Sequence, residues 1–210
     1  MLSFIVQILV DFVLFVINKI GYAGIFFLMV LESANIPVPS EAIMPFSGFL
    51  VEKQIFSFWL VVLAGAFGNL IGSLISYGLA DKIVESGFLN KHRIFKFFLN
   101  SRDLEIAKRW FDRYGKSSIF FSRMLPVVRT FISFPAGLAK MNLWEFSYLT
   151  FLGSFIWSVV LTYSGIILGE RWGSVRIYLE KFDYLILAVV FITFSYWVYS
   201  RFLKNYRKEL

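Results

Sequence analysis

Two apolar runs of 26 residues each, 55–80 and 143–168, most constrain what this chain can fold into. A helix needs about 20 residues to cross the hydrocarbon core of a bilayer, so both runs are long enough to span it. A run at 184–200 is just long enough, and shorter apolar runs occupy 2–17 and 20–31. The 210 residues are 58% hydrophobic, with a mean hydropathy of +0.70. We therefore predict an all-α integral membrane protein.

Basic residues gather in two places and predict how the chain is oriented. The amphipathic segment 81–118 contains nine Lys or Arg residues and the tail 201–210 contains four, whereas the short connection 51–54 contains only Lys53. Loops rich in Lys and Arg stay in the cytoplasm, so we expect 81–118 and the C-terminus inside and 51–54 outside. Because these basic groups flank spans, the net charge of +7 indicates anionic lipid headgroups as partners, and not nucleic acid.

Two segments of the chain resemble each other. Residues 22–49 and 114–138 both run from a Tyr through Ile-Phe-Phe and a charged residue to a Pro, a second charged residue, and a Pro closely followed by Gly. The tail and the basic segment lie on the same side only if 119–139 enters and leaves the membrane from one face. We therefore expect two inverted repeats, 20–80 and 119–168, each a re-entrant helical hairpin followed by a long transmembrane helix.

The remaining segments complete a single membrane domain over residues 1–210. Residues 1–19 are predicted to form an N-terminal helix. Asp11 lies on a polar stripe of this helix, which fits either a partly buried span or an interfacial helix. After the second repeat we expect a C-terminal transmembrane helix at 184–200, followed by the basic tail 201–210.

Prolines explain how the two predicted hairpins turn inside the membrane. Each Pro removes a backbone donor and disfavours helix for the residue before it. Broken backbone survives at membrane depth only where protein buries it or water reaches it, which implies a polar cavity near the midplane. The predicted hairpin breaks are at Pro37, Pro39, Pro45, Pro126 and Pro135.

Four charged residues lie within the hairpins, and their sign differs between the two halves. The first hairpin carries Glu32 and Glu41 where the second carries Arg123 and Arg129. A charge at the bilayer centre costs at least about 2.5–3.5 kcal/mol. If the hairpin tips meet, two acids face two bases, which offsets this cost and creates a site for an anion or a proton. In the structural alternative, Glu41 favours a helix N-terminus and the arginines snorkel to the interface.

The chain resembles the DedA family of bacterial inner-membrane proteins in the strings LESANIPVPSEAIMPFSGFL, FFSRMLPVVRTFISFPAGLAKMN and GSFIW. The VTT (SNARE-associated) domain of this family is shared with eukaryotic lipid scramblases. The resemblance covers roughly residues 20–170. It implies a re-entrant-helix fold and proton-dependent lipid translocation across the bacterial cytoplasmic membrane. The paired acids of the family fall on Glu32 and Glu41, and its paired arginines on Arg123 and Arg129.

The form IPVPSEAIMPFSGF is most similar to family members that return undecaprenyl phosphate from the outer to the inner leaflet. Guanidinium forks match phosphate geometry, so we expect Arg123 and Arg129 to bind the lipid phosphate. Glu32 and Glu41 would then couple transport to protons. Two alternatives stay open: a phosphatidylethanolamine flippase, as other members of the family suggest, and a non-selective scramblase.

A membrane lipid phosphatase is the alternative from a different class, because two arginines could equally hold a phosphate that is cleaved. That chemistry usually needs a nucleophile or a metal. The sequence has no HExxH, GxSxG or GxxxxGK[ST] string. We therefore expect a transporter without catalytic residues, cofactor or metal. The sequence leaves its oligomeric state open, a homo-oligomer included.

Overall fold

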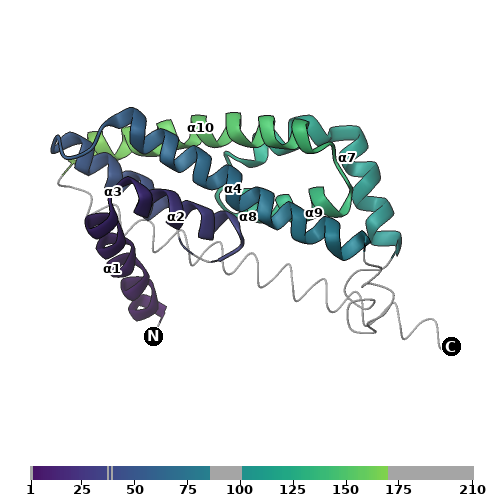
Figure 1. Ribbon diagram of the computed structural model, residues 1–210, viewed down its shortest axis with the longest axis horizontal. Helices are drawn as coiled ribbons and strands as arrows, with labels where there is room; N and C mark the ends of the chain where they lie inside the picture. Colours follow the sequence, from purple (N-terminus) through teal and green to yellow (C-terminus); the bar gives the residue numbers. More distant parts are fainter. Residues whose placement is uncertain (1, 37, 39, 86–100, 170–210) are drawn as a thin grey trace.

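Helices make up the regular structure of the described part of the chain, residues 2–36, 38, 40–85 and 101–169. The computed structural model has no strand in these ranges, so the predicted all-α class is confirmed. The first half contains α1 (Leu2–Ile20), α2 (Tyr22–Ser33), α3 (Ser40–Glu52) and α4 (Phe58–Glu85). The second half contains α7 (Ser101–Ser122), α8 (Pro126–Phe131), α9 (Ser133–Leu138) and α10 (Leu143–Leu168) (Figure 1).

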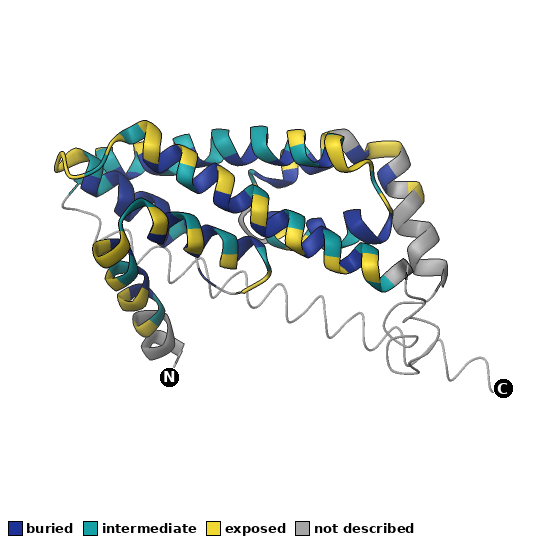
Figure 2. Cartoon of the chain, viewed as in Figure 1, coloured by how far each residue is buried: buried dark blue, intermediate teal, exposed yellow. Residues whose placement is uncertain are grey.

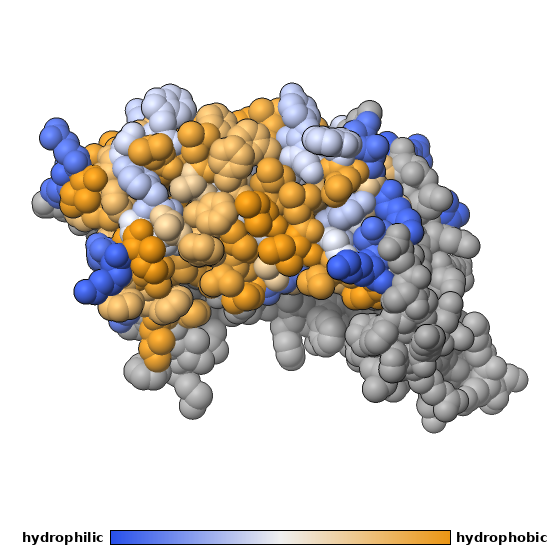
Figure 3. Space-filling view, viewed as in Figure 1, coloured by the Kyte–Doolittle hydropathy of each residue, from blue (hydrophilic) through white to orange (hydrophobic). Residues whose placement is uncertain are grey.

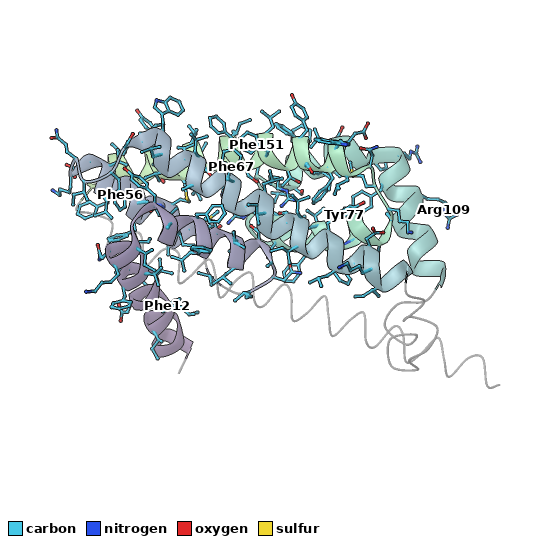
Figure 4. The ribbon with its side chains drawn as sticks, in the orientation of Figure 1. Phe12, Phe56, Phe67, Tyr77, Arg109 and Phe151 are labelled. Carbon is cyan, nitrogen blue, oxygen red and sulfur yellow. The ribbon has the colours of Figure 1, made fainter. Side chains whose placement is uncertain are left out.

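α4 and α10 contain the two stretches of the described chain that are long and apolar enough to cross a membrane. These stretches, Phe58–Ile83 and Leu143–Leu168, extend about 39 Å at 1.5 Å per residue, more than the roughly 30 Å of a bilayer core. The two helices lie side by side along the long axis (Figure 1). Phe67 of α4 contacts Phe151 of α10, with ring centroids 4.9 Å apart (Figure 4). Figure 3 shows an apolar surface between two hydrophilic ends, as lipid contact requires.

Shorter helices pack against both long ones. In the first half, α2 lies against α4 and α3 lies against α10; in the second half, α9 lies against α4 and α7 against α10. Their inward faces are buried and their outer faces are exposed (Figure 2). The 12 residues of α2 and the 13 of α3 reach about 18–20 Å each, too short to cross a bilayer core alone. Helix ends therefore lie inside the apolar body of the protein.

Local sequence signals determine where three of these helices begin. α3 begins at Ser40 with Glu41 in its first turn, where a carboxylate suits the positive end of the helix dipole. α8 begins at Pro126, and the preceding Leu125 has extended backbone, as a residue before Pro prefers. Asn142 precedes α10, and its side chain accepts hydrogen bonds from the first backbone N–H groups of that helix.

Glycines allow the helices to approach until backbone meets backbone. Gly68 of α4 faces the carbonyl oxygen of Phe26 in α2, and a Cβ there would lie 2.5 Å from that oxygen. At the crossing of α3 and α10, Gly165 lies directly against the backbone of Pro45. A side chain at either position would overlap the neighbouring helix, so the close packing depends on glycine.

α1 packs mainly against α2 and α3. Val10, Val13 and Ile17 are buried, and Val13 and Ile17 join the apolar cluster formed mainly by α2 and α3. Figure 1 shows α1 running across the direction of α4 and α10. Phe12, labelled in Figure 4, is half exposed. α1 therefore braces the first half of the fold without entering the α4–α10 contact.

Three predicted boundaries or breaks differ from the structure. Pro45 does not break its helix: it lies inside α3, where its ring removes only one hydrogen bond near the helix start. α7 continues without interruption across the predicted boundary between 118 and 119 and ends at Ser122. α4 extends to Glu85, beyond the predicted end at 80. Pro37, Pro39, the predicted helix 184–200 and the tail 201–210 lie outside the described residues.

Replacing Gly165 by Ala should destabilise the protein by about 1–3 kcal/mol, the usual cost of overpacking, because the new methyl group meets the backbone of Pro45. Thermal unfolding of the detergent-solubilised protein measures this effect. Gly78→Ala in α4 is the matched control, since nothing lies within 4 Å of a Cβ built there. The control should be neutral or slightly stabilising. Equal unfolding temperatures for the two variants would contradict the close crossing.

Candidate functional site

The four charged residues predicted to form the site come from helix ends of both halves. Glu32 is the second-last residue of α2, and Glu41 is the second residue of α3. Arg123 directly follows α7, and Arg129 lies in α8. Figure 1 shows the end of α2 beside α8 near the middle of the molecule. The side chains of both arginines are buried, with residue exposures of 1% and 2%.

Arg129 is the centre of the site because it binds both predicted acids. Its Nη2 atom lies 2.6 Å from Oε1 of Glu32 and 3.3 Å from Oε1 of Glu41. The Glu32 side chain is 7% exposed and that of Glu41 is 23% exposed. Removing one partner of a buried ion pair typically costs about 3–5 kcal/mol, because the other charge is left uncompensated. The acids and the base therefore hold the two halves together at this point.

Hydroxyl groups complete the surroundings of Glu32. Ser40 Oγ, at the start of α3, donates to Oε1 at 3.3 Å. Ser33 Oγ, at the end of α2, donates to Oε2 at 3.4 Å. Both carboxylate oxygens thus have a donor from the protein, and the less buried Glu41 is the acid that solvent reaches more readily.

Arg123 has different surroundings and forms no ion pair with any described residue. Its Nη1 donates to Ser73 Oγ at 2.9 Å and to the carbonyl oxygen of Arg129 at 3.0 Å. Its Nη2 donates to Ser133 Oγ at 3.0 Å and to Thr150 Oγ1 at 3.2 Å. Its four acceptors belong to α4, α8, α9 and α10. The predicted meeting of two acids with two bases therefore holds for Arg129, while Arg123 joins four helices through neutral oxygens.

Several residues of the site are absent from the sequence prediction. The hydroxyls of Ser73, Ser133 and Thr150 hold Arg123, and the rings of Phe146 and Trp157 each lie 5.7 Å from the guanidinium carbon of Arg123 and Arg129 respectively. The only sequence signal for them is a hydroxyl or aromatic residue within an apolar run. Such residues are common, so the run alone does not single them out.

The site combines charge-assisted donors with titratable acids, and the arginines and Glu32 are buried. Arginine suits the oxygens of a phosphate or carboxylate group. A carboxylate that pairs with arginine releases it when protonated, so protonation of an acid can free Arg129 to bind another anion. In the described ranges, no group of three or more His, Cys, Asp or Glu is placed to hold a metal ion.

Known proteins similar to this chain come from bacteria. An alkaline phosphatase-like protein of Lactococcus lactis subsp. cremoris is 34% identical over 88% of this chain and 87% of its own length. Undecaprenyl phosphate transporter A of Staphylococcus aureus is 32% identical over 90% of this chain and 93% of its own. The protein of the same name from Bacillus subtilis is 30% identical over 88% and 91%. No solved structure matches the chain significantly.

A family model places the chain more firmly than any single relative. The model of the VTT domain matches residues 38–167, which include α3, α4, α7, α8, α9 and all but the last residue of α10. The matched region contains Glu41, Arg123 and Arg129, and the similarity to the two transporters extends over most of the chain. This membrane protein therefore belongs to the VTT-domain, or DedA, family.

Proposed function

We propose that this protein moves a phosphate-bearing lipid, specifically undecaprenyl phosphate, across the bacterial cytoplasmic membrane for carrier-lipid recycling, in a proton-coupled cycle. The observation that carries the proposal is the buried Arg129, which is held by two carboxylates and is suited to a phosphate group. Two similar proteins are named undecaprenyl phosphate transporter A. Membrane-embedded ionisable groups most often serve transport, because they are costly to keep otherwise.

We also propose that α2–α4 and α7–α10 are inverted repeats with re-entrant hairpins. α4 and α10 run in opposite directions, as such repeats require (Figure 1). Gly48 of α3 lies against the carbonyl oxygen of Thr162 in α10. Gly137 of α9 lies against that of Tyr77 in α4. Each half thus places a hairpin glycine on the far end of the other half's long helix.

A second pair of equivalent contacts supports the repeat. Gly68 faces the carbonyl oxygen of Phe26, and Gly153 lies close to that of Phe120; each Phe is the middle residue of an Ile-Phe-Phe string. The residues that follow these two glycines, Asn69 and Ser154, contact each other: Ser154 Oγ donates to Asn69 Oδ1 at 2.8 Å. A contact between equivalent positions is what a two-fold axis between the repeats would produce.

The proposed orientation follows the positive-inside rule, with 81–118 and the C-terminus in the cytoplasm. Arg109 and Arg113 are exposed on α7, at the end of the molecule away from the 53–57 turn (Figure 4). Basic side chains at this end would contact anionic lipid headgroups. The turn 53–57 would then face the outside.

The proposed cycle is an exchange of partners at Arg129. Protonation of Glu32 or Glu41 from outside weakens the hold of that acid, and the lipid phosphate takes its place on the guanidinium. Loss of the proton to the cytoplasm restores the carboxylate, which displaces the phosphate on that side. The lipid tails stay in the bilayer, so the headgroup enters sideways between hairpins and long helices.

Reconstitution into liposomes tests the function. Undecaprenyl phosphate should change leaflet rapidly when the outside is acidic, and much more slowly without a pH gradient. Phosphatidylethanolamine should move no faster than in protein-free liposomes. Equal, gradient-independent movement of both lipids would indicate a scramblase, and faster movement of phosphatidylethanolamine would indicate a phospholipid flippase. If neither lipid moves, the proposed function is wrong.

The name alkaline phosphatase-like, given to one similar protein, makes a lipid phosphatase the second candidate. Purified protein incubated with lipid phosphates distinguishes the two. We expect no release of inorganic phosphate above the rate of a heat-inactivated sample. Turnover with these substrates would replace the transporter proposal by an enzymatic one.

Glu32→Gln and Glu41→Gln test which acid carries the proton. The variant that lacks the proton-carrying acid should transport the lipid at a rate that no longer depends on pH. Gln resembles the protonated acid, so Arg129 is no longer under pH control. The rate measured between about pH 5.5 and 8 should then be flat, whereas the rate of the unmodified protein should rise as the outside pH falls. Leaflet exchange in the same liposomes measures this.

Glu52→Gln is the matched control for these variants, because Glu52 lies on the same helix as Glu41 but is exposed at its other end, where it pairs with Lys53. Its pH profile should equal that of the unmodified protein. An unchanged profile in both Glu32→Gln and Glu41→Gln would exclude these acids from proton coupling.

A further inference from the structure

Three buried side-chain N–H groups have no acceptor in the described part of the protein: Nε of Arg123, Nε of Arg129 and Nε1 of Trp157. The last two belong to neighbouring side chains. Both groups can only donate, so neither can be satisfied by the other. The two side chains are in contact: the guanidinium carbon of Arg129 lies 5.7 Å from the centre of the Trp157 ring. Buried donors without acceptors are rare in folded proteins, and each one calls for an explanation.

The two acids of the site do not supply the missing acceptor. Glu32 and Glu41 both bind Nη2 of Arg129, and the Nε edge of the same guanidinium is left without a partner. A water molecule would accept from these donors, but it would also need acceptors for its own hydrogens. An oxyanion needs none, and it gains from the positive charge of the arginine.

A comparison of the two proposed repeats indicates that helix packing at the position of Trp157 does not require a large side chain. When Gly68 and Asn69 are placed on Gly153 and Ser154, the position of Trp157 falls on Gly72. Gly72 packs against the carbonyl oxygen of Val30 in α2. One half therefore uses this position for close helix packing, and the other uses it for a large side chain that carries a donor beside Arg129.

We propose that Trp157 is a phosphate-binding residue: its indole N–H and the Nε–H of Arg129 donate to oxygens of the phosphate group of the transported lipid. This inference rests on the proposed function and deepens it. Among the described residues these donors have no acceptor while Arg129 still holds both acids, so the phosphate docks on this edge first. When an acid then leaves Arg129, Nη2 becomes available as a further donor to the phosphate. The phosphate is then held by Trp157 and by both edges of the Arg129 guanidinium.

Binding of decyl phosphate, a short-chain phosphomonoester, to the full-length protein in detergent tests the inference. Trp157→Phe keeps an aromatic ring beside Arg129 and removes only the N–H donor. It should weaken decyl phosphate binding roughly tenfold or more, the effect of one hydrogen bond to a charged group. Trp144→Phe is the matched control: Trp144 lies on the same helix and is 84% exposed, and the affinity should not change.

A second measurement does not depend on the folding of that variant. The unmodified chain has six tryptophans, and ¹⁵N labelling of their indoles gives one N–H signal each. Decyl phosphate should shift one signal downfield, and Phe variants of the other five tryptophans should each retain it. Inorganic phosphate should shift the same signal at higher concentration if the phosphate alone is recognised, whereas decanol should not.

The results separate this inference from the function on which it rests. If decyl phosphate binds but the affinity of Trp157→Phe equals that of Trp144→Phe, or the shifted signal belongs to another tryptophan, Trp157 is not a binding residue and the proposed function stands. If the unmodified protein binds no decyl phosphate, the proposed function itself fails. If decanol, which has no phosphate, shifts the same signal, the signal reports contact with the alkyl chain. That result would overturn the assignment of Trp157 as a phosphate-binding residue.

Discussion

The ion pair between Arg129 and Glu32 is the interaction on which the rest of the structure depends. It joins α8 to the end of α2 across 97 residues of sequence, inside an apolar body where an unpaired charge is expensive. Once both charges are buried, the helices that carry them must end beside each other. The broken backbone there is covered by α4 and α10, and glycines let the covering helices come close enough to exclude water.

The second arginine shows that a buried cation can be held without a carboxylate. Arg123 reaches four neutral oxygens on four helices, so it acts as a tie between elements more than as half of an ion pair. One of these oxygens is the backbone carbonyl of Arg129 itself. Arg123 thereby holds the backbone of Arg129, whose side chain is proposed to bind phosphate. The two arginines thus have different contacts within one site.

Hydropathy and the cost of buried charge were enough to predict the all-α class, the long helices and the meeting of Glu32 and Glu41 with a base. They could not predict which arginine pairs with both acids. The positions of Arg123 and Arg129 depend on α8 and α9, and helices of six residues are too short to be recognised from hydropathy. Proline was a good guide at Pro126, where a helix begins, and a poor one at Pro45, which lies within α3 beyond its first turn. Buried hydroxyls gave no signal, since serine and threonine occur throughout apolar runs.

The division of charge between the halves has a consequence for how such a protein can arise. The acids belong to α2 and α3 and the bases to the segments around α8, so two copies of either half would bring like charges together. Neither half can pair with itself through this contact. If the proposed repeats arose by duplication, two identical halves could pair symmetrically only before their charges differed in sign. With the present charges each half complements the other, so a reversal of sign at Arg129 would need the opposite change at the acids.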